Sequence, residues 1–348
     1  MKVVQFSQFG VPHEVAGPVD APEPGAPVKG EVAVELLCSP INPADLLLLS
    51  GNYGHRPVLP AHGGLEGVGR VVALGPGVEH LAVGDRVLLP GGCWCERMVA
   101  SAGGLFALPA AAASEQLAML TVNPPTAWGL LHDYVTLEAG DWVIQNAANS
   151  GVGTSLIALA KRLGLRTVSV VRRDDTVAEL RARGGDVVLV DGPDLAERAR
   201  AAIAASATSA TSATSATSTT STASAGGRLR LGVDAIGGEA TARIAASLDD
   251  GAIVVNYGLL SGQDCQVSGR ELVFRGVRLA GYWLVHWFAR HPRPEIARVY
   301  GELAAMISDG TITVPIAARY PLSQVREALE HAAREARGGK ILLVPDAG

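Results

Sequence analysis

The spacing of hydrophobic positions divides the chain into regions of different structure. From the N-terminus to about Leu120, short apolar runs alternate with Gly and Pro, a pattern typical of antiparallel strands joined by turns. It predicts a compact, partly barrel-like β-rich domain. The predicted strands are Lys2–Phe6, Glu31–Cys38, Gly67–Leu74, Asp85–Leu89 and Arg97–Ala100.

Beyond this region, apolar runs of strand length alternate with stretches of helical spacing. Two helices are predicted first, Ser114–Leu120 and Thr126–Tyr134, and Asn123-Pro124-Pro125 opens the second of them. The alternation of strands and helices that follows predicts a parallel, doubly wound sheet. Its predicted strands start at Trp142 and continue with Leu165–Val171, Val187–Val190, Leu231–Ala235, Ala252–Asn256 and Val277–Leu284.

The end of the chain carries further short helices and strands after this sheet is complete. A helix is predicted over 294–307, a strand over 317–320, a helix over 322–333 and a last strand over 340–344. We expect these pieces to return to the first domain. The sequence therefore predicts an α/β protein with a β-rich domain (1–122 and 286–348) and a parallel-sheet domain (123–285).

One segment of the parallel-sheet domain (123–285) has an unusual composition. Ser206–Ala225 consists of Ala, Thr and Ser in a near three-residue repeat, between the third and fourth predicted strands of the sheet. Such a segment has few apolar groups to bury. We expect a low-complexity surface insertion that is mobile and dispensable for binding.

A glycine-bearing turn joins the first strand of the sheet to a helical pattern. The apolar run from Trp142 leads into Asn149-Ser150-Gly151-Val152-Gly153, and the residues that follow have helical spacing. Small residues at a helix N-terminus allow a pyrophosphate to approach the free N–H groups and the positive end of the helix dipole. The turn is thus predicted to bind a dinucleotide, although an ordinary tight turn has a similar sequence.

The end of the second strand indicates which dinucleotide is bound. Arg172 and Arg173 follow Val171, where an acidic side chain is typical of NAD-binding units. Guanidinium groups match a phosphate in a bidentate way, so this pair favours NADP(H). Asp174 and Asp175 come next, and a strand that ended two residues later would place a carboxylate at the ribose instead.

Composition and charge exclude several classes of function. A net charge of −5 offers no general attraction to nucleic acid, and no apolar stretch is long enough to cross a membrane. The N-terminus enters strand-like sequence at once, so we expect a soluble, cytoplasmic protein. The four cysteines are too scattered for a disulfide framework. Cys93-Trp94-Cys95 is interpreted as buried packing, not as half of a metal site.

Several short stretches of the chain, taken in order, match one superfamily. They are Ser39–Asp45, Gly51–Gly54, Gly64–Gly67, Val122–Pro124, Ile144–Gly153 and Gly281–Leu284. Over nearly its whole length the chain resembles the medium-chain dehydrogenases/reductases, and within them the zinc-free, NADPH-dependent trans-2-enoyl-thioester (CoA or acyl-carrier-protein) reductases, with quinone oxidoreductases as relatives. The resemblance implies a GroES-like catalytic domain and a Rossmann cofactor domain.

The same resemblance assigns roles to individual residues. It implies that Tyr53 donates a proton and that Asn123 lies beside the nicotinamide. Arg172 and Arg173 would hold the 2′-phosphate, and Lys340 would touch the cofactor from the last strand. The pyrophosphate would lie on Asn149, Ser150, Gly151, Val152 and Gly153, and the nicotinamide end would be lined by Tyr257, Gly258, Tyr282, Trp283 and Leu284.

The resemblance also implies what the protein acts on and what it lacks. Zinc alcohol dehydrogenases place Cys, His and Glu where this chain has Asn42, Leu65 and Glu66, so neither catalytic nor structural zinc is expected. The expected reaction is reduction of an enoyl thioester of CoA or acyl carrier protein, by a homodimer. Two alternatives stay open: a zinc-independent quinone or enone reductase, and a noncatalytic NADPH-binding relative.

Overall fold

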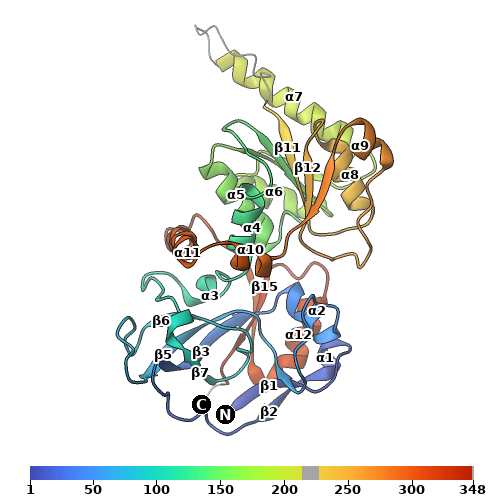
Figure 1. Cartoon of the computed structure of the whole chain (residues 1–348). Helices are drawn as coiled ribbons and strands as arrows, with labels where there is room; N and C mark the ends of the chain where they lie inside the picture. Colours follow the sequence, from blue (N-terminus) through green and yellow to red (C-terminus); the bar gives the residue numbers. More distant parts are fainter. Residues whose placement is uncertain (214–226, 347–348) are drawn as a thin grey trace. The chain divides into compact units, whose positions relative to one another are not determined.

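The computed structural model describes residues 1–213 and 227–346, which belong to two compact units (Figure 1). Unit 1 comprises Met1–Asn123 and Arg293–Gly348, and unit 2 comprises Pro124–Pro292. The chain therefore returns to unit 1 at Arg293, later than the predicted boundary at 286. The reason is helix α10 (Leu284–Arg290), whose Trp287 ring packs edge-on against Trp128 of unit 2, with ring centroids 5.8 Å apart.

Unit 1 contains two sheets whose strands are mostly antiparallel. A small sheet has the order β2-β1-β4, and a larger one has the order β14-β15-β3-β5-β6, with β7 paired to β3. The C-terminal strands β14 and β15 pair in parallel, and β15 joins β3 near the end of that strand. The bounds are β1 (Lys2–Phe6), β2 (Ala16–Asp20), β3 (Glu31–Pro40), β4 (Ala61–His62), β5 (Gly67–Leu74), β6 (Arg86–Leu89), β7 (Arg97–Ser101), β14 (Ile316–Pro321) and β15 (Lys340–Val344).

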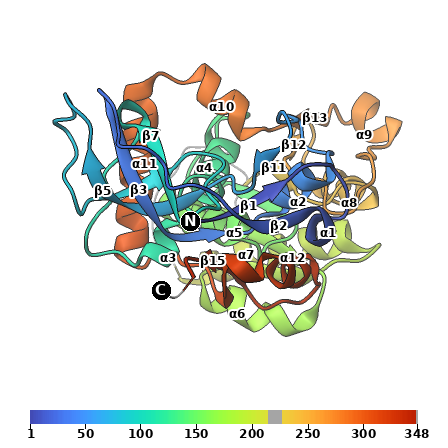
Figure 2. The ribbon, with the colours of Figure 1, turned by 90° about the horizontal axis from the view of Figure 1, so that it is seen from below.

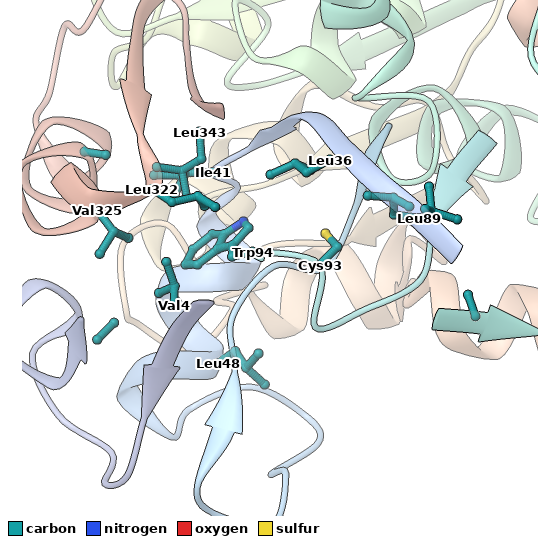
Figure 3. Packing of buried hydrophobic residues seen from close by; sticks show 14 of the residues in the cluster. Val4, Leu36, Ile41, Leu48, Leu89, Cys93, Trp94, Leu322, Val325 and Leu343 are labelled. Atoms are coloured by element: carbon teal, nitrogen blue, oxygen red, sulfur yellow. The ribbon is translucent and has the colours of Figure 1, made fainter. Parts of the chain in front are cut away.

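The core of unit 1 lies between these sheets and the helices that cover them. Helix α12 lies beside β15 in both overall views (Figure 1, Figure 2). Figure 3 shows the Trp94 indole surrounded by aliphatic side chains from several elements, including Val4, Ile41 and Leu322. The helices of this unit are α1 (Pro12–Val15), α2 (Pro43–Ser50), α3 (Ser114–Leu117), α11 (Arg293–Ser308) and α12 (Val325–Ala333), with 3-10 turns η1 (Ala102–Gly104) and η3 (Leu322–Gln324).

Unit 2 is built on a six-stranded parallel sheet of order β10-β9-β8-β11-β12-β13. The order reverses direction at β8, the strand that leads into the glycine-bearing turn. This arrangement confirms the predicted Rossmann-type fold class. The strands are β8 (Trp142–Gln145), β9 (Arg166–Val171), β10 (Val187–Val190), β11 (Leu229–Asp234), β12 (Ile253–Asn256) and β13 (Arg278–Gly281).

Helices cover both faces of this sheet because strand side chains point alternately to either side. One face packs against α5 and α6 through Ile157 and Leu180, and the other against α7 and α8 through Leu195 and Ile244. Each face therefore has its own apolar core. The helices of the unit are α4 (Asn123–His132), α5 (Gly151–Arg162), α6 (Val177–Ala182), α7 (Leu195–Ala213), α8 (Glu239–Ser247), α9 (Gly269–Phe274) and α10, with the 3-10 turn η2 (Asp174–Thr176).

Several parts of the structure differ from the sequence prediction, and β2 and β4 are among the elements that were not predicted. Residues 43–50 form helix α2, where no helix was predicted. Strand β13 ends at Gly281, and Leu284 already begins α10, so the predicted strand to Leu284 is too long. Helix α7 continues to Ala213, so the predicted insertion starts as helix; its residues 214–225 lie outside the described part of the chain. Over the described ranges, no helix is long and apolar enough to cross a membrane.

Candidate active site

The Asn-Pro stretch after β3 forms the beginning of α2. Asn42 is the N-cap with extended backbone, and Pro43 occupies the first turn, where a missing N–H does no harm. The Asp45 carboxylate accepts hydrogen bonds from the backbone N–H of Asn42 at 2.7 Å and of Leu65 at 2.9 Å. Asp45 thus ties the start of α2 to the glycine-rich connector 63–67, which contains Leu65 and leads into β5.

The other end of α2 carries the predicted proton donor. Gly51 closes the helix with φ 77°, a conformation that favours glycine. Tyr53 follows, and its backbone N–H donates to Leu47 at 3.1 Å. The Tyr53 ring is half-buried and packs against the core of unit 1. One short helix therefore joins the Asn42 region to Tyr53.

The Trp94 indole fixes the connector that precedes β5. A Cβ atom on Gly63 would lie 2.3 Å from this ring, and one on Gly64 would lie 2.4 Å from it. The indole N–H donates to Ser39 Oγ at 2.9 Å, and Ser39 donates in turn to the Glu66 carbonyl at 2.5 Å. The Gly63-Gly64 pair is needed because the backbone passes directly over a tryptophan. The interpretation of Trp94 and its flanking cysteines as buried packing agrees with this arrangement.

A cluster of polar side chains lies buried where these elements meet; we call Asn42, Asp45, Glu66, Asn123 and Lys340 the polar cluster. Each of the five side chains belongs to a residue at most 5% exposed. Glu66 Oε1 accepts from Asn42 Nδ2 at 2.6 Å and from Asn123 Nδ2 at 3.3 Å. Asn42 Oδ1 accepts from Asn123 Nδ2 at 3.3 Å and from the Lys340 ammonium. All five residues belong to unit 1.

Burial changes the acid–base properties of this cluster. Desolvation raises the pKa of Asp45 and that of Glu66 to about 7, although backbone and Asn42 donors and the Lys340 charge act in the opposite direction. Desolvation also lowers the pKa of Lys340 to about 8, against the attraction of Glu66 and Asp45. Near neutral pH the two carboxyl groups therefore titrate, while the Lys340 ammonium is mostly protonated.

In unit 2, the turn after β8 brings the backbone into an unusual conformation. Ala147 has φ 47°, which a side chain disfavours by roughly 1 kcal/mol. Ser150 caps α5, and its Oγ accepts from the Gly153 N–H at 3.1 Å. A Cβ atom on Gly153 would lie 2.5 Å from the Ala148 carbonyl oxygen. The helix N-terminus is thus packed closely on the strand, as a pyrophosphate site requires.

The segment after β12 meets this turn. A hydrogen bond joins the Tyr257 hydroxyl to Ser150; burial raises the pKa of Tyr257 and this bond lowers it. A Cβ atom on Gly258 would lie 2.6 Å from the Ala235 carbonyl oxygen, so the backbone also approaches β11 closely here. Tyr257 and Gly258 therefore lie beside the predicted pyrophosphate turn, which fits a bound dinucleotide.

The predicted residues after β13 have different environments. The Tyr282 ring is buried against Gly129 of α4, and its hydroxyl donates to the Pro125 carbonyl at 3.4 Å. Trp283 is the N-cap residue of α10, its ring lies 5.1 Å from that of His286, and Leu284 is half-buried in the first turn of the helix. Tyr282 thus contributes to the packing of unit 2, which the sequence pattern did not indicate.

The two arginines after β9 are exposed. Arg173 is bidentate to Asp175, with Nε 3.1 Å from Oδ1 and Nη2 2.9 Å from Oδ2. The carboxylate that follows the pair therefore contacts Arg173, the residue predicted to hold the 2′-phosphate. A phosphate at this position would compete with Asp175 for the same guanidinium.

The structure brings some of the predicted site residues together and adds others. Asn123 and Lys340 meet in the polar cluster, and Ser150, Gly153 and Tyr257 meet at the turn. Asn149 is exposed in this turn, and Gly151 and Val152 form the buried first turn of α5. Asn42, Asp45 and Glu66 were not predicted as site residues; the available signal was that they lie in the stretches Ser39–Asp45 and Gly64–Gly67, which carry the family resemblance. Within residues 1–213 and 227–346, no group of three or more His, Cys, Asp or Glu side chains is placed to hold a metal.

Two family models match the chain. The alcohol dehydrogenase GroES-like domain matches residues 28–149, and the model described as zinc-binding dehydrogenase matches residues 200–343. The mitochondrial enoyl-[acyl-carrier-protein] reductase of Xenopus tropicalis is 35% identical over 314 residues, which cover 87% of this chain and 84% of the relative. These matches confirm the resemblance on which the sequence prediction depends.

Two solved structures share the fold over nearly the full chain. The Etr1p complex with NADP and crotonyl-CoA has a TM-score of 0.83 at 23% identity, covering 99% of each chain. The Escherichia coli quinone oxidoreductase in complex with NADPH has a TM-score of 0.81 at 26% identity, covering 99% of this chain and 100% of the other.

Proposed function

Because the chain belongs to the enoyl-[acyl-carrier-protein] reductase family of medium-chain dehydrogenases/reductases, we propose that it reduces the 2,3 double bond of trans-2-enoyl thioesters with NADPH. The observation that carries this proposal is the meeting of Asn123 and Lys340 in one buried polar cluster of the catalytic unit, which α2 links to Tyr53. Asn123 and Lys340 are far apart in the sequence and both are assigned to the cofactor, so this assignment requires their side chains to lie close together.

Residues within each unit suit groups of NADP(H). The tight packing of Gly153 on Ala148 and the Ser150–Tyr257 contact form a turn suited to a pyrophosphate. The exposed guanidinium groups of Arg172 and Arg173 suit a 2′-phosphate. We assign the cofactor to these groups, to Asn149–Val152, Gly258, Tyr282, Trp283 and Leu284, and to Asn123 and Lys340.

The chemistry of the reaction divides between cofactor and protein. NADPH, when bound, supplies the hydride that adds to the β-carbon of the enoyl thioester. The α-carbon then takes a proton, and Tyr53 supplies it from its phenolic hydroxyl. A phenol with an ordinary pKa of about 10 stays protonated at neutral pH and can still protonate a strongly basic carbon. The polar cluster orients the side chains that face the cofactor.

Replacement of Tyr53 by Phe tests this function directly. The change removes one hydroxyl and keeps the ring that packs against unit 1. We expect kcat with crotonyl-CoA to fall by about 10²- to 10⁴-fold, the usual contribution of a general acid. The measurement is NADPH oxidation followed by absorbance, with NADPH affinity and thermal unfolding as controls for an intact fold.

Wild type and Tyr53→Phe also distinguish the alternative functions when a simple quinone is tested as a second acceptor. The likeness to a quinone oxidoreductase favours a quinone or enone reductase as the second candidate. Quinone oxygens take protons from water, so that activity would not depend on Tyr53. A wild-type protein that is silent on crotonyl-CoA but turns over quinone would replace our proposal with the second candidate. Silence on both acceptors, with NADPH bound, would favour a noncatalytic relative.

Three further assignments accompany this function. We propose a homodimer, which light scattering of the purified protein would test. We also propose that no metal takes part, and elemental analysis of protein purified without chelator should give substoichiometric zinc. A cytoplasmic location is proposed from the sequence, whereas the similar relative is described as mitochondrial, so imaging of the tagged chain is the relevant test.

A further inference from the structure

The carboxylate of Glu66 lies at the centre of the polar cluster but has no role assigned above. It is 0% exposed, and its two oxygens face three N–H donors. Oε1 accepts from the Asn42 and Asn123 amides at 2.6 and 3.3 Å, and Oε2 accepts from the Val122 backbone N–H at 2.9 Å. An ionised carboxylate only accepts, so this set of partners matches its charged form.

These contacts fix both the backbone and the side chain of one segment. Val122 and Asn123 are adjacent and lead into α4, and both donate to Glu66. The two cluster bonds of the Asn123 amide both use Nδ2. The amide is therefore held with its nitrogen inside the cluster, and its orientation depends on Glu66.

Glu66 also acts on Lys340 through one intermediate amide. Asn42 donates its Nδ2 to Glu66 and accepts the Lys340 ammonium at its Oδ1. A buried ammonium needs a nearby negative charge, and Glu66 and Asp45 supply it. The Arg337 charge also acts on Lys340, and the charges of Asp45 and Glu66 act in turn on the neutral Cys93 thiol.

We propose that Glu66 is a positioning residue for the reduction. Its carboxylate fixes the Asn123 amide, and through Asn42 the Lys340 ammonium, in the orientations that the nicotinamide end of NADPH requires. This inference rests on the proposed function, because that function assigns Asn123 and Lys340 to the cofactor. The contacts themselves lie wholly within unit 1.

Glu66→Gln is the direct test, because it keeps the shape and removes the charge. In either orientation of the new amide, its NH₂ group faces an N–H donor, from Val122 on one side or from Asn42 and Asn123 on the other. Since small displacements of reacting groups lower rates strongly, we expect kcat/KM for crotonyl-CoA to fall about 10- to 100-fold. The Kd for NADPH, measured by fluorescence titration, should rise as well.

A double-mutant cycle with Asn123→Ala separates positioning from general destabilisation. If Glu66 acts through Asn123, the double variant should bind NADPH and turn over about as well as the worse single variant. Additive losses in both quantities would overturn the inference, as would a Glu66→Gln protein with wild-type Kd and kcat/KM. Glu115→Gln is the matched control, since that carboxylate of unit 1 pairs with Arg319 outside the cluster.

The outcomes also separate this inference from the proposed function. A wild type that does not reduce crotonyl-CoA would refute the proposed function. The double-mutant cycle, measured as the Kd for NADPH, would still test whether Glu66 positions Asn123. If Glu66→Gln fails to fold, Glu66→Asp replaces it: the shorter carboxylate keeps the charge but cannot reach Val122 and Asn123 together. Its Kd and kcat/KM should then fall between those of wild type and Asn123→Ala, and wild-type values would overturn the inference.

Discussion

Two regions of the molecule carry charges proposed to serve the same cofactor, and they are built in opposite ways. In the polar cluster of unit 1, Glu66 is 0% exposed and Lys340 is 5% exposed. In unit 2, the Arg173 and Asp175 side chains that follow β9 are 42% and 63% exposed. The first region is a closed hydrogen-bond network, and the second is an ion pair in contact with solvent.

This difference decides how each region responds to change. Inside a protein the dielectric constant is low, so a buried network that loses one member leaves its partners unpaired at a high free-energy cost. An exposed pair is screened by water and salt and contributes little to stability. Changes in the polar cluster should therefore alter stability and geometry together, whereas changes in the arginine pair should alter affinity alone.

The largest effect is expected from the connector that supports the cluster. Gly64→Ala adds a Cβ atom 2.4 Å from the Trp94 ring at a residue with φ 96°. Overpacking and the unfavourable φ should together lower the free energy of unfolding by about 2 to 5 kcal/mol. Gly77→Ala is the matched control, because its φ is 81° but its Cβ would meet only the Lys29 side chain at 3.8 Å.

Urea denaturation of the two variants measures this difference. Gly77→Ala should lower the free energy of unfolding by about 1 to 2 kcal/mol, the usual effect of a left-handed backbone at alanine. Equal losses in the two variants would mean that the Trp94 contact does not constrain the connector. The conclusion that the polar cluster responds to change differently from the exposed arginine pair would then lose its support.

The connector also shows what sequence reasoning can and cannot reach. The fold class and the turn at Gly151–Gly153 were predicted because each depends on a local pattern of apolar spacing and small residues. Helix α2 was missed although its signal is local: Asn42, Pro43 and Asp45 form an N-cap, first-turn proline and capping box. The stretches Ser39–Asp45 and Gly64–Gly67 were recognised only through their resemblance to the family.

Other features depend on contacts that no local pattern contains. The role of Glu66 follows from donors at Asn42, Val122 and Asn123, which only the fold brings together. The prediction that β13 extends to Leu284 failed because Tyr282 is apolar enough to continue a strand but packs against α4 instead. Buried side chains look alike in sequence whether they continue a strand or leave it.

In unit 2, replacing both Arg172 and Arg173 by Ala should weaken NADPH binding about 10- to 100-fold, because each charge-assisted bond to a phosphate contributes roughly 1 kcal/mol or more. NADH binding and the unfolding temperature should stay unchanged. Isothermal titration with both cofactors at low and high salt measures this. Arg183→Ala, on an exposed arginine paired with Glu179, is the control. Equal losses for NADH would refute the 2′-phosphate assignment.

The polar cluster should give the stability of the fold a dependence on pH. Asp45 and Glu66 have folded pKa values of about 7, above their ordinary values. Between roughly pH 4.5 and 7 the folded state therefore keeps protons that the unfolded state has lost, and the contribution of these groups to stability falls as pH rises. Lys340 has a folded pKa of about 8, below its ordinary value, so above pH 8 the folded state has lost a proton that the unfolded state keeps. Its contribution to stability therefore rises with pH between 8 and the ordinary pKa of lysine.

The cluster should thus stabilise the fold least near pH 7 to 8, where all three charges are present. Urea unfolding across pH 5 to 10 of wild type and of the double variant Glu66→Gln, Lys340→Met measures the contribution. We expect the wild-type curve to dip relative to the variant by about 1 kcal/mol around neutrality. Parallel curves would contradict the cluster's proposed charge state.

The smallest expected effect is the most specific one. Asp175→Asn releases Arg173 from a bidentate carboxylate, and that guanidinium is then available to the 2′-phosphate. Exposed ion pairs contribute at most about 1 kcal/mol, so the Kd for NADPH should fall by no more than about fivefold. Asp174→Asn is the matched control: it removes the same charge one residue earlier, so only the loss of the Arg173 contact distinguishes the two variants. If both variants bind NADPH equally well, the gain comes from net charge alone. If Asp175→Asn binds NADPH more weakly than wild type, the carboxylate orients Arg173 for the phosphate and does not compete with it.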